Sequence, residues 1–165
     1  MRRLPTLDQV RGLPSGGVVA VPPEYADENG HVNVRHHVAL YDDAEWVLYE
    51  GYDLGVAHAE AGLGGVFALE QHLIYRAEVL VGDEVAVHVR LLRRSDRLLH
   101  LVSYLVNLTR SEVAGSMEAL EGYVDLGTRR LAPFPEPGAS ALDALVAEAA
   151  ALGWTPELSG SITLR

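Results

Sequence analysis

The densest group of side chains able to do chemistry lies in residues 25–33, which read YADENGHVN. Within this segment Asp27 can act as a base or a nucleophile, and His31 can hydrogen-bond that carboxylate or a bound water. Gly30 permits a positive φ or a close backbone approach. The segment directly precedes an apolar stretch without proline or glycine. We therefore expect this polar cluster immediately before the N-terminus of a helix.

The apolar stretch predicts one long helix over residues 34 to about 49. Its apolar residues recur at helical spacing and share one face; they are Val34, Val38, Tyr41, Ala44 and Leu48. Asn33 is the expected N-cap because its side chain can accept from the first free backbone N–H groups. Those N–H groups carry partial positive charge, which suits a developing oxyanion.

Strands flank this helix on both sides. Residues 16–21 predict a short strand, and after a loop at 62–65 the period changes to two. Four longer strands are expected at about 66–79, 85–92, 98–108 and 113–126, with turns at 82–83, 95–96 and 110–111. Short connections predict an antiparallel meander of these four strands, with the helix covering one face.

The ends of the chain are expected to lie outside this unit. Residues 1–15 are punctuated by proline and predict irregular structure, and residues 132–139 contain three prolines and predict a surface segment. Residues 141–152 predict a terminal helix. We expect one domain over residues 1–165, with its core at about 16–131 and the proline-rich segment and helix at 132–165.

Composition excludes several classes of function. The net charge of −10 argues against binding to nucleic acid or to anionic membranes. The chain has no cysteine, which excludes disulfides, a thiol nucleophile and cysteine zinc sites, and it has no lysine for a Schiff base. It shows no secretory signal pattern and no apolar run of about 18 residues. We expect a cytoplasmic protein that neither spans nor binds a membrane.

The polar cluster contains residue types that could bind a metal, but their spacing argues against two kinds of metal site. His36 and His37 lie near His31 and Asp27, but adjacent histidines on a helix point about 100° apart and rarely bind one ion. A calcium loop beginning at Asp27 would need glycine at its sixth position, where the chain has Val32. The sequence therefore implies no metal and no cofactor.

The order strand, polar loop, long helix and four strands resembles the α+β hot-dog fold, an antiparallel sheet wrapped around one long central helix. The motif resembles acyl-CoA thioesterases of the hydroxybenzoyl-CoA thioesterase branch, and it comprises Asp27, Gly30, His31, Val32 and Asn33. The resemblance covers about residues 17–130. Residues 122–135 are similar to the end of some of these enzymes, including thioesterases linked to carnitine and betaine metabolism.

This resemblance implies hydrolysis of an acyl-CoA thioester to free acid and CoA. The family carries its catalytic acid at the position of Asp27, which would be the nucleophile or the base. His31 and Asn33 would orient the reacting groups, and the backbone amides of Val34 and Arg35 would stabilise the oxyanion.

Two further groups follow from the implied substrate and assembly. CoA phosphates favour arginine, and the candidates cluster at one hairpin: Arg93, Arg94 and Arg97. Related folds share the site across a homodimer or a dimer of dimers. The second subunit would then contribute Glu70, Gln71 and His72 from the first long strand.

Other interpretations remain open from the sequence alone. Asp27 is also a common turn residue, and the three arginines could be a solvated hairpin. A hot-dog hydratase or dehydratase of enoyl-thioesters would use Asp-x-Asn-Pro-x-His, whereas here glycine replaces the proline and His31 comes one residue early. A non-catalytic module that binds acyl-thioesters is a third possibility. The sequence does not identify the acyl group.

Overall fold

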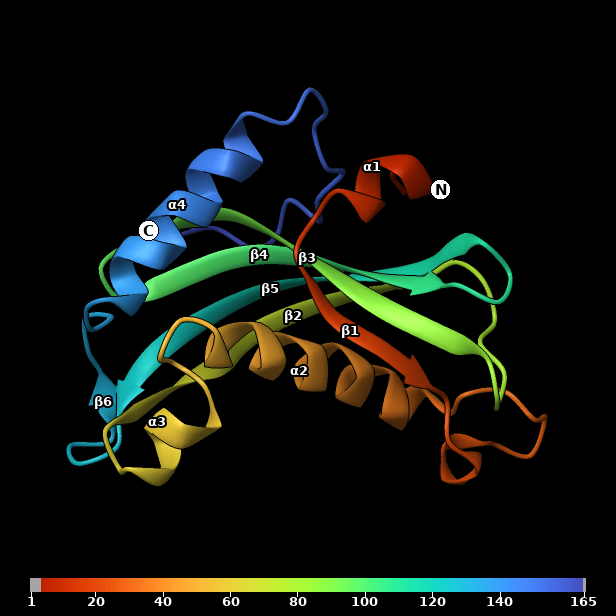
Figure 1. Cartoon of the computed structure of the whole chain (residues 1–165), viewed down its shortest axis with the longest axis horizontal. Helices are drawn as coiled ribbons and strands as arrows, with labels where there is room; N and C mark the ends of the chain where they lie inside the picture. Colours follow the sequence, from red (N-terminus) through yellow and green to blue (C-terminus); the bar gives the residue numbers. More distant parts are fainter. Residues whose placement is uncertain (1–3, 165) are drawn as a thin grey trace.

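In the computed structural model, which describes residues 4–164, one antiparallel sheet curls around a long helix (Figure 1). The strands are β1 (Ser15–Ala20), β2 (Gly64–Tyr75), β3 (Glu84–Arg94), β4 (Leu98–Asn107), β5 (Glu112–Asp125) and β6 (Arg130–Leu131). The helices are α1 (Leu7–Arg11), α2 (Val34–Glu50), α3 (Val56–Glu60) and α4 (Gly138–Ala150), with a 3₁₀ turn at Pro23–Tyr25. This arrangement is the one expected for a hot-dog fold.

Helix α2 begins where the sequence predicts, because Asn33 caps it. The Asn33 side-chain oxygen accepts the Arg35 amide at 3.2 Å. The sheet-facing side of α2 buries Leu40, Tyr41, Ala44, Leu48 and Tyr49. Burying one large apolar side chain stabilises a fold by about 1.5–3 kcal/mol, so this face holds the helix in the sheet.

The crossing of α2 over β1 depends on one glycine. A Cβ at Gly16 would lie 2.5 Å from the Cα and carbonyl oxygen of Ala44. No real Cβ tolerates that approach, so any larger residue would push the helix away from the strand. Gly16 therefore sets how deeply α2 sits in the sheet.

The sheet order is β1-β3-β4-β5-β2, with β6 on β5. The predicted meander is right for β3, β4 and β5, which follow one another through tight turns. It is wrong for β2, which pairs with β5 at the far edge instead of with β3. The connection of residues 76–83 is long enough to carry the chain past the ends of the intervening strands. One edge of β2 is left without a partner strand among the described residues.

Strand β2 also ends earlier than predicted. The amides of Arg76 and Ala77 both donate to the Ala114 carbonyl, at 2.8 and 3.0 Å, which closes the ladder after Tyr75. The chain then turns toward residues 26–32. The Val32 amide donates to the Val79 carbonyl at 2.8 Å. Residues 76–79, which the alternation of polar and apolar residues predicts as strand, therefore lie beside the polar loop of residues 26–32.

The N-terminal prediction needs correction within residues 4–15, since residues 1–3 lie outside the described part. A capping box at Thr6 and Gln9 starts α1. Helix α1 packs Val10 against Val102 on the face of the sheet opposite α2. Among residues 4–164, no helix is both long and apolar enough to cross a membrane.

The C-terminal helix is present as α4 and begins a few residues earlier than predicted. The preceding proline-rich segment is not wholly at the surface, because Phe134 and Ala139 join the main core. The Arg90 guanidinium donates to the carbonyls of Ala149 and Trp154, at 2.9 and 3.0 Å. These bonds hold the end of α4 and the following segment against the sheet.

A pair of carboxyl groups is buried between α2 and the sheet. Glu45 is 2% exposed and accepts the Ser103 hydroxyl at 2.5 Å, while Glu121 is 5% exposed and accepts the Tyr49 hydroxyl. Burial raises the pKa of Glu45 well above its usual value, and the neighbouring Glu121 raises it further. Burial also raises the pKa of Glu121. The folded protein therefore keeps protons on this pair that the unfolded chain releases.

We expect this pair to make stability fall as pH rises. Because the folded pKa is raised, the stabilisation is complete below the usual glutamate pKa and is lost as pH rises through the folded value. Glu45→Gln keeps an acceptor for Ser103 but cannot ionise. Its free energy of unfolding, measured by urea denaturation from about pH 5 to 8, should therefore fall less than that of the wild type.

The matched control is Glu60→Gln, which alters an exposed helical glutamate on α3. Its stability should follow the wild-type curve. If the free energy of unfolding changes equally with pH in Glu45→Gln and in the wild type, the buried pair does not hold protons in the folded protein as we expect.

Candidate functional site at the N-terminus of α2

The Asp27 carboxylate is held inside its own turn. Its Oδ1 accepts the amides of Asn29 at 2.8 Å and His31 at 3.1 Å. The Asp27 amide donates to the His31 carbonyl at 2.8 Å, and Gly30 closes the turn at φ = 80°. A side chain at Gly30 would be strained in that conformation. The turn thus needs its glycine to present the carboxylate.

These bonds set the charge of Asp27. The Asn29 amide is the largest of the effects that lower the pKa of Asp27, and the His31 amide and the Asn29 side chain add to it. Together they outweigh desolvation, so the pKa lies below its usual value. Asp27 is therefore fully ionised at neutral pH and is a weak base.

The loop delivers Asp27 to the start of α2. The Asn33 amide donates to the Tyr25 carbonyl at 2.8 Å, and Ala26 and His31 form bridges with Val32 and Leu80 respectively. Of the two predicted oxyanion amides, that of Arg35 is occupied by the Asn33 cap. The Val34 amide has no acceptor within residues 4–164.

A cavity of about 450 Å³ opens beside this turn. Its lining comes from the loop, the first turn of α2 and the segment after β2: Asp27, His31, Val32, Val34, His37, Tyr75, Arg76, Ala77, Glu78 and Val79. Four polar lining residues lie outside the sequence prediction, namely His37, Tyr75, Arg76 and Glu78. The sequence marks His37 only as a disfavoured metal ligand near Asp27. It predicts Tyr75, Arg76 and Glu78 as part of a strand, so no local pattern indicates that these three lie beside Asp27.

The adjacent histidines of α2 point to different surroundings. His36 stacks on Tyr25 with ring centroids 4.3 Å apart, whereas His37 lines the cavity and meets Tyr75 edge-on at 5.0 Å. Burial lowers the pKa of His37, which favours a neutral imidazole in the cavity wall. Among the described residues, no three His, Asp or Glu side chains are grouped to hold a metal ion.

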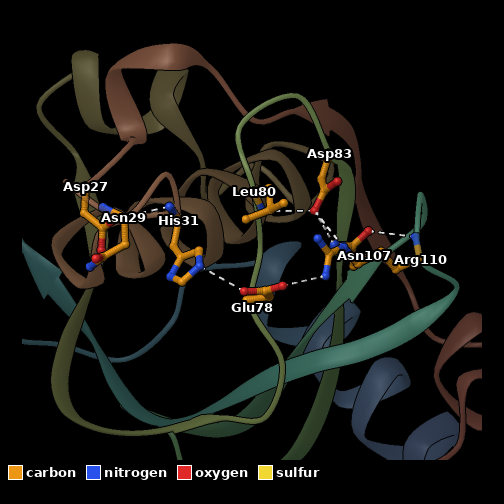
Figure 2. A network of polar contacts seen from close by, with 8 residues as sticks. All are labelled: Asp27, Asn29, His31, Glu78, Leu80, Asp83, Asn107 and Arg110. Atoms are coloured by element: carbon orange, nitrogen blue, oxygen red, sulfur yellow. Dashed lines mark hydrogen bonds and ion pairs between the residues drawn. The ribbon is translucent and has the colours of Figure 1, made fainter.

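The His31 imidazole faces Glu78 and does not bond to the Asp27 carboxylate (Figure 2). Its Nε2 lies 2.9 Å from Glu78 Oε2, and both side chains are a little under half exposed. The other Glu78 oxygen accepts from Arg110 Nη1 at 3.0 Å. The site therefore contains two separate carboxylates: Asp27, bound by backbone amides, and Glu78, bound by a histidine and an arginine.

The three predicted CoA arginines lie away from this cavity within one protomer. Glu84 pairs with Ala20 near the loop, and Arg94 is ten residues further along β3, about 33 Å at 3.3 Å per residue. Arg94 is bound by both oxygens of Asp143, at 2.6 and 2.5 Å, and Arg97 lies 3.4 Å from Asp96. Arg93 lies on the same hairpin.

The predicted second-subunit residues lie on the free-edged strand. Glu70 is exposed, and Gln71 and His72 are partly buried, all on β2. The strand also exposes three large apolar side chains, Phe67, Leu69 and Tyr75. Tyr75, the last residue of β2, lines the cavity, so the free edge leads directly to the site.

The chain matches known proteins both in sequence and in structure. The family model of the thioesterase-like superfamily matches residues 21–145, which include the loop, α2 and the whole sheet except β1. A curated Rhizobium meliloti protein, L-carnitine dehydrogenase/betainyl-CoA thioesterase, is 22% identical over 111 residues, which are 67% of this chain and 22% of that protein. The chain thus spans about a fifth of the length of that relative.

Two solved structures show the same fold. A Staphylococcus aureus protein determined in complex with CoA aligns with a TM-score of 0.79 at 21% identity, over 93% of this chain and 97% of that chain. A thioesterase of Thermus thermophilus, solved with coenzyme A and zinc, aligns with a TM-score of 0.68 at 24% identity, over 82% and 97% of the two chains. These alignments confirm the expected architecture of a curled sheet around α2.

Proposed function

This chain belongs to the thioesterase-like superfamily, and on that premise we propose that it hydrolyses an acyl-CoA thioester to the free acid and CoA. One observation carries the proposal. The ionised Asp27 lies at the edge of a 450 Å³ cavity that also includes the first residue of α2. That arrangement places a carboxylate nucleophile next to a helix N-terminus, where a thioester carbonyl could be polarised.

The low pKa of Asp27 favours attack on the acyl carbon over removal of a proton from water. A carboxylate with a lowered pKa is a weak base but remains fully ionised as a nucleophile. Attack would form a mixed anhydride and release the CoA thiolate. Water must then hydrolyse the anhydride. Of the two histidines that line the cavity, we assign His31 to accept the proton of that water, because it lies in the same turn as Asp27.

The oxyanion would be stabilised by the N-terminus of α2. Since the Arg35 amide is occupied by Asn33, the Val34 amide is the better donor of the two predicted ones. The partial positive charge of the helix end adds to this donor. Asn33 supports catalysis indirectly, because its cap fixes where α2 begins.

We expect Asp27→Asn to lower kcat/KM by about a hundredfold or more, because an amide can neither attack nor take a proton. The measurement is release of free thiol from a panel of short, long and aromatic acyl-CoAs. Betainyl-CoA belongs in the panel because the curated relative is named for it.

Glu28→Gln is the matched control, since it removes an exposed carboxylate from the same loop and should leave the rate near wild type. Thermal unfolding should show that both variants remain folded. If wild-type protein is stabilised by acyl-CoA but never releases thiol, the chain is a binding module and the hydrolase proposal fails.

Recognition of CoA points to Arg76. This residue lines the cavity itself, and no carboxylate partner binds it among residues 4–164. Guanidinium groups bind phosphate bidentately, so Arg76 suits the phosphates of a CoA whose thioester reaches Asp27. The hairpin arginines Arg93, Arg94 and Arg97 could serve only the site of a partner copy, because of their distance along β3.

Arg76→Gln should raise KM for acyl-CoA by about tenfold, because one charged phosphate contact is lost. KM for the matching N-acetylcysteamine thioester, which has no phosphate, should not change. Arg93→Gln made in parallel tests the hairpin. A rise in KM for both thioesters in Arg76→Gln would show that the residue shapes the cavity and does not bind phosphate.

We further propose that two copies associate through the free edge of β2. An exposed strand edge with apolar side chains is a ready surface for pairing. A second copy paired there would wall the cavity beside Tyr75. Glu70, Gln71 and His72 would then be positioned to contact substrate bound by the partner.

Leu69→Glu should weaken this dimer by at least about tenfold in dissociation constant, since it places a charge in an apolar contact. Sedimentation velocity over a range of concentrations measures the effect. Val18→Glu alters an equally exposed apolar residue on β1, the opposite edge strand, and should leave the mass unchanged. A monomeric wild type would refute the association.

A further inference from the structure

The contacts of the cavity continue beyond Glu78 to the turn between β4 and β5. Arg110 lies in this turn, and its Nη1 donates to Glu78 Oε1 at 3.0 Å. On the other side of Glu78, Oε2 meets His31 Nε2 at 2.9 Å. Glu78 therefore uses one oxygen for the histidine and the other for the arginine, as Figure 2 shows.

Arg110 is itself held in place by two buried polar residues. Its backbone amide donates to Asn107 Oδ1 at 3.0 Å, and its Nε lies 3.6 Å from Asp83 Oδ2. Asp83 Oδ2 also accepts from Asn107 Nδ2 at 2.7 Å and from the Leu80 amide at 3.0 Å. Asn107 and Asp83 are both buried. The guanidinium thus extends from a fixed point toward two half-exposed side chains.

We propose that Arg110 is a positioning residue of the thioester-cleaving site, which clamps Glu78 so that Glu78 fixes the orientation and tautomer of the His31 ring. This inference rests on the proposed function and adds a residue to it. Arg110 is not itself a lining residue of the cavity and makes no contact with the carboxylate of Asp27, so it acts only through Glu78, which does line the cavity.

The clamp has a defined consequence for the imidazole. A carboxylate at Nε2 keeps the ring proton on that nitrogen, which leaves the lone pair on Nδ1. His31 Nδ1 has no hydrogen bond within the described part of the chain. The ring belongs to the cavity lining, so Nδ1 is the nitrogen available to a water there.

The proton balance of hydrolysis assigns Nδ1 its task. The oxygen of one water bonds to the acyl carbon of the anhydride, and the bond from that carbon to Asp27 breaks with its electron pair. One proton of the water passes to Nδ1 and then to solvent, from which the CoA thiolate released in the first step takes one proton to become the free thiol. The second proton stays on the product acid and is lost to solvent at neutral pH.

Charged groups around His31 give the clamp a signature in pH profiles. The ring contacts Glu78, with Arg110 behind it, and the cavity that His31 lines is also lined by three other titratable or charged residues: Asp27 from the loop, His37 from α2 and Arg76 from the segment after β2. Glu78→Gln removes a negative charge that touches the ring, and Arg110→Gln removes a positive charge behind it. These two substitutions should therefore move the acid limb of the pH profile, the range in which kcat/KM falls as pH is lowered, in opposite directions.

The test compares Arg110→Gln, Arg110→Lys and Glu78→Gln with the wild type, and Arg11→Gln, an exposed arginine on α1, is the control. We expect Arg110→Gln to lower kcat by about tenfold with little change in KM. Its acid limb of kcat/KM should move to higher pH, whereas that of Glu78→Gln should move to lower pH. Arg110→Lys keeps the charge, so it should restore the position of the limb.

A second readout does not depend on activity. Long-range ¹H–¹⁵N spectra of histidine side chains report which ring nitrogen carries the proton. In the wild type, neutral His31 should be almost entirely the Nε2–H tautomer, and in Arg110→Gln the two tautomers should mix. Circular dichroism establishes that each variant is folded. If Arg110→Gln unfolds, the tautomer of Glu78→Gln decides: a mixture of tautomers is expected because the carboxylate at Nε2 is gone, and an unchanged tautomer would overturn the clamp.

These readouts separate the two proposals. Wild-type kcat, pH profile and tautomer in folded Arg110→Gln would overturn the clamp, even if the enzyme hydrolyses acyl-CoA. Limbs that move in the same direction in Arg110→Gln and Glu78→Gln would also overturn it. If the tautomer responds to Arg110 but wild-type protein releases no thiol, the clamp is supported and the proposed hydrolysis fails.

Discussion

The site depends on one contact between distant parts of the chain, the hydrogen bond from the Val32 amide to the Val79 carbonyl. Together with the bridge between His31 and Leu80, it joins the loop before α2 to the segment after β2. This pairing brings the carboxylate of Asp27, the N-terminus of α2 and the carboxylate of Glu78 around one cavity. Ending β2 at Tyr75 is therefore a requirement of the site, because a longer strand would carry residues 76–80 away along β5.

The same chain holds carboxyl groups in two opposite electrostatic states. Asp27 accepts backbone amides that favour its anion, so its pKa falls below the usual value. Glu45 is buried beside Glu121, so desolvation first and the neighbouring carboxyl next raise its pKa, and the hydrogen bond from the Ser103 hydroxyl does not offset them. The first environment suits a nucleophile, which must be ionised. The second suits a neutral hydrogen-bonded pair that joins α2 to the sheet, because a charged pair there would be costly to bury.

Local features of this fold could be predicted from the sequence, and long-range pairings could not. The Asn33 cap and the period of α2 depend on neighbouring residues, and both are found as expected. The capping box of Thr6 and Gln9 is an equally local signal, present in the sequence but overlooked because prolines surround it. The place of β2 beside β5 depends on where residues 76–83 lead the chain, which alternation of polar and apolar residues does not encode.

The residues of the candidate site also fall into those that local sequence predicts and those that only long-range pairing brings together. The motif places Asp27, Gly30 and His31 within one turn, so their proximity follows from the sequence itself. Glu78, Arg76 and Arg110 reach the site through strand pairing and a hairpin turn, and no spacing in the sequence joins them to residue 31. The hairpin arginines show the converse, because they cluster in the sequence but lie away from the loop, with Arg94 about 33 Å along β3 from it.

The cavity lies next to the free edge of β2, so pairing of two copies at that edge would affect the reaction in the cavity. Tyr75 belongs both to the cavity wall and to the end of the strand whose outer edge is free among the described residues. A water-exposed cavity weakens electrostatic stabilisation, because solvent screens the charges that a closed site would concentrate. A second copy paired along β2 would cover the cavity beside Tyr75 and exclude water there. Pairing of this strand therefore bears on the strength of the site as well as on its shape.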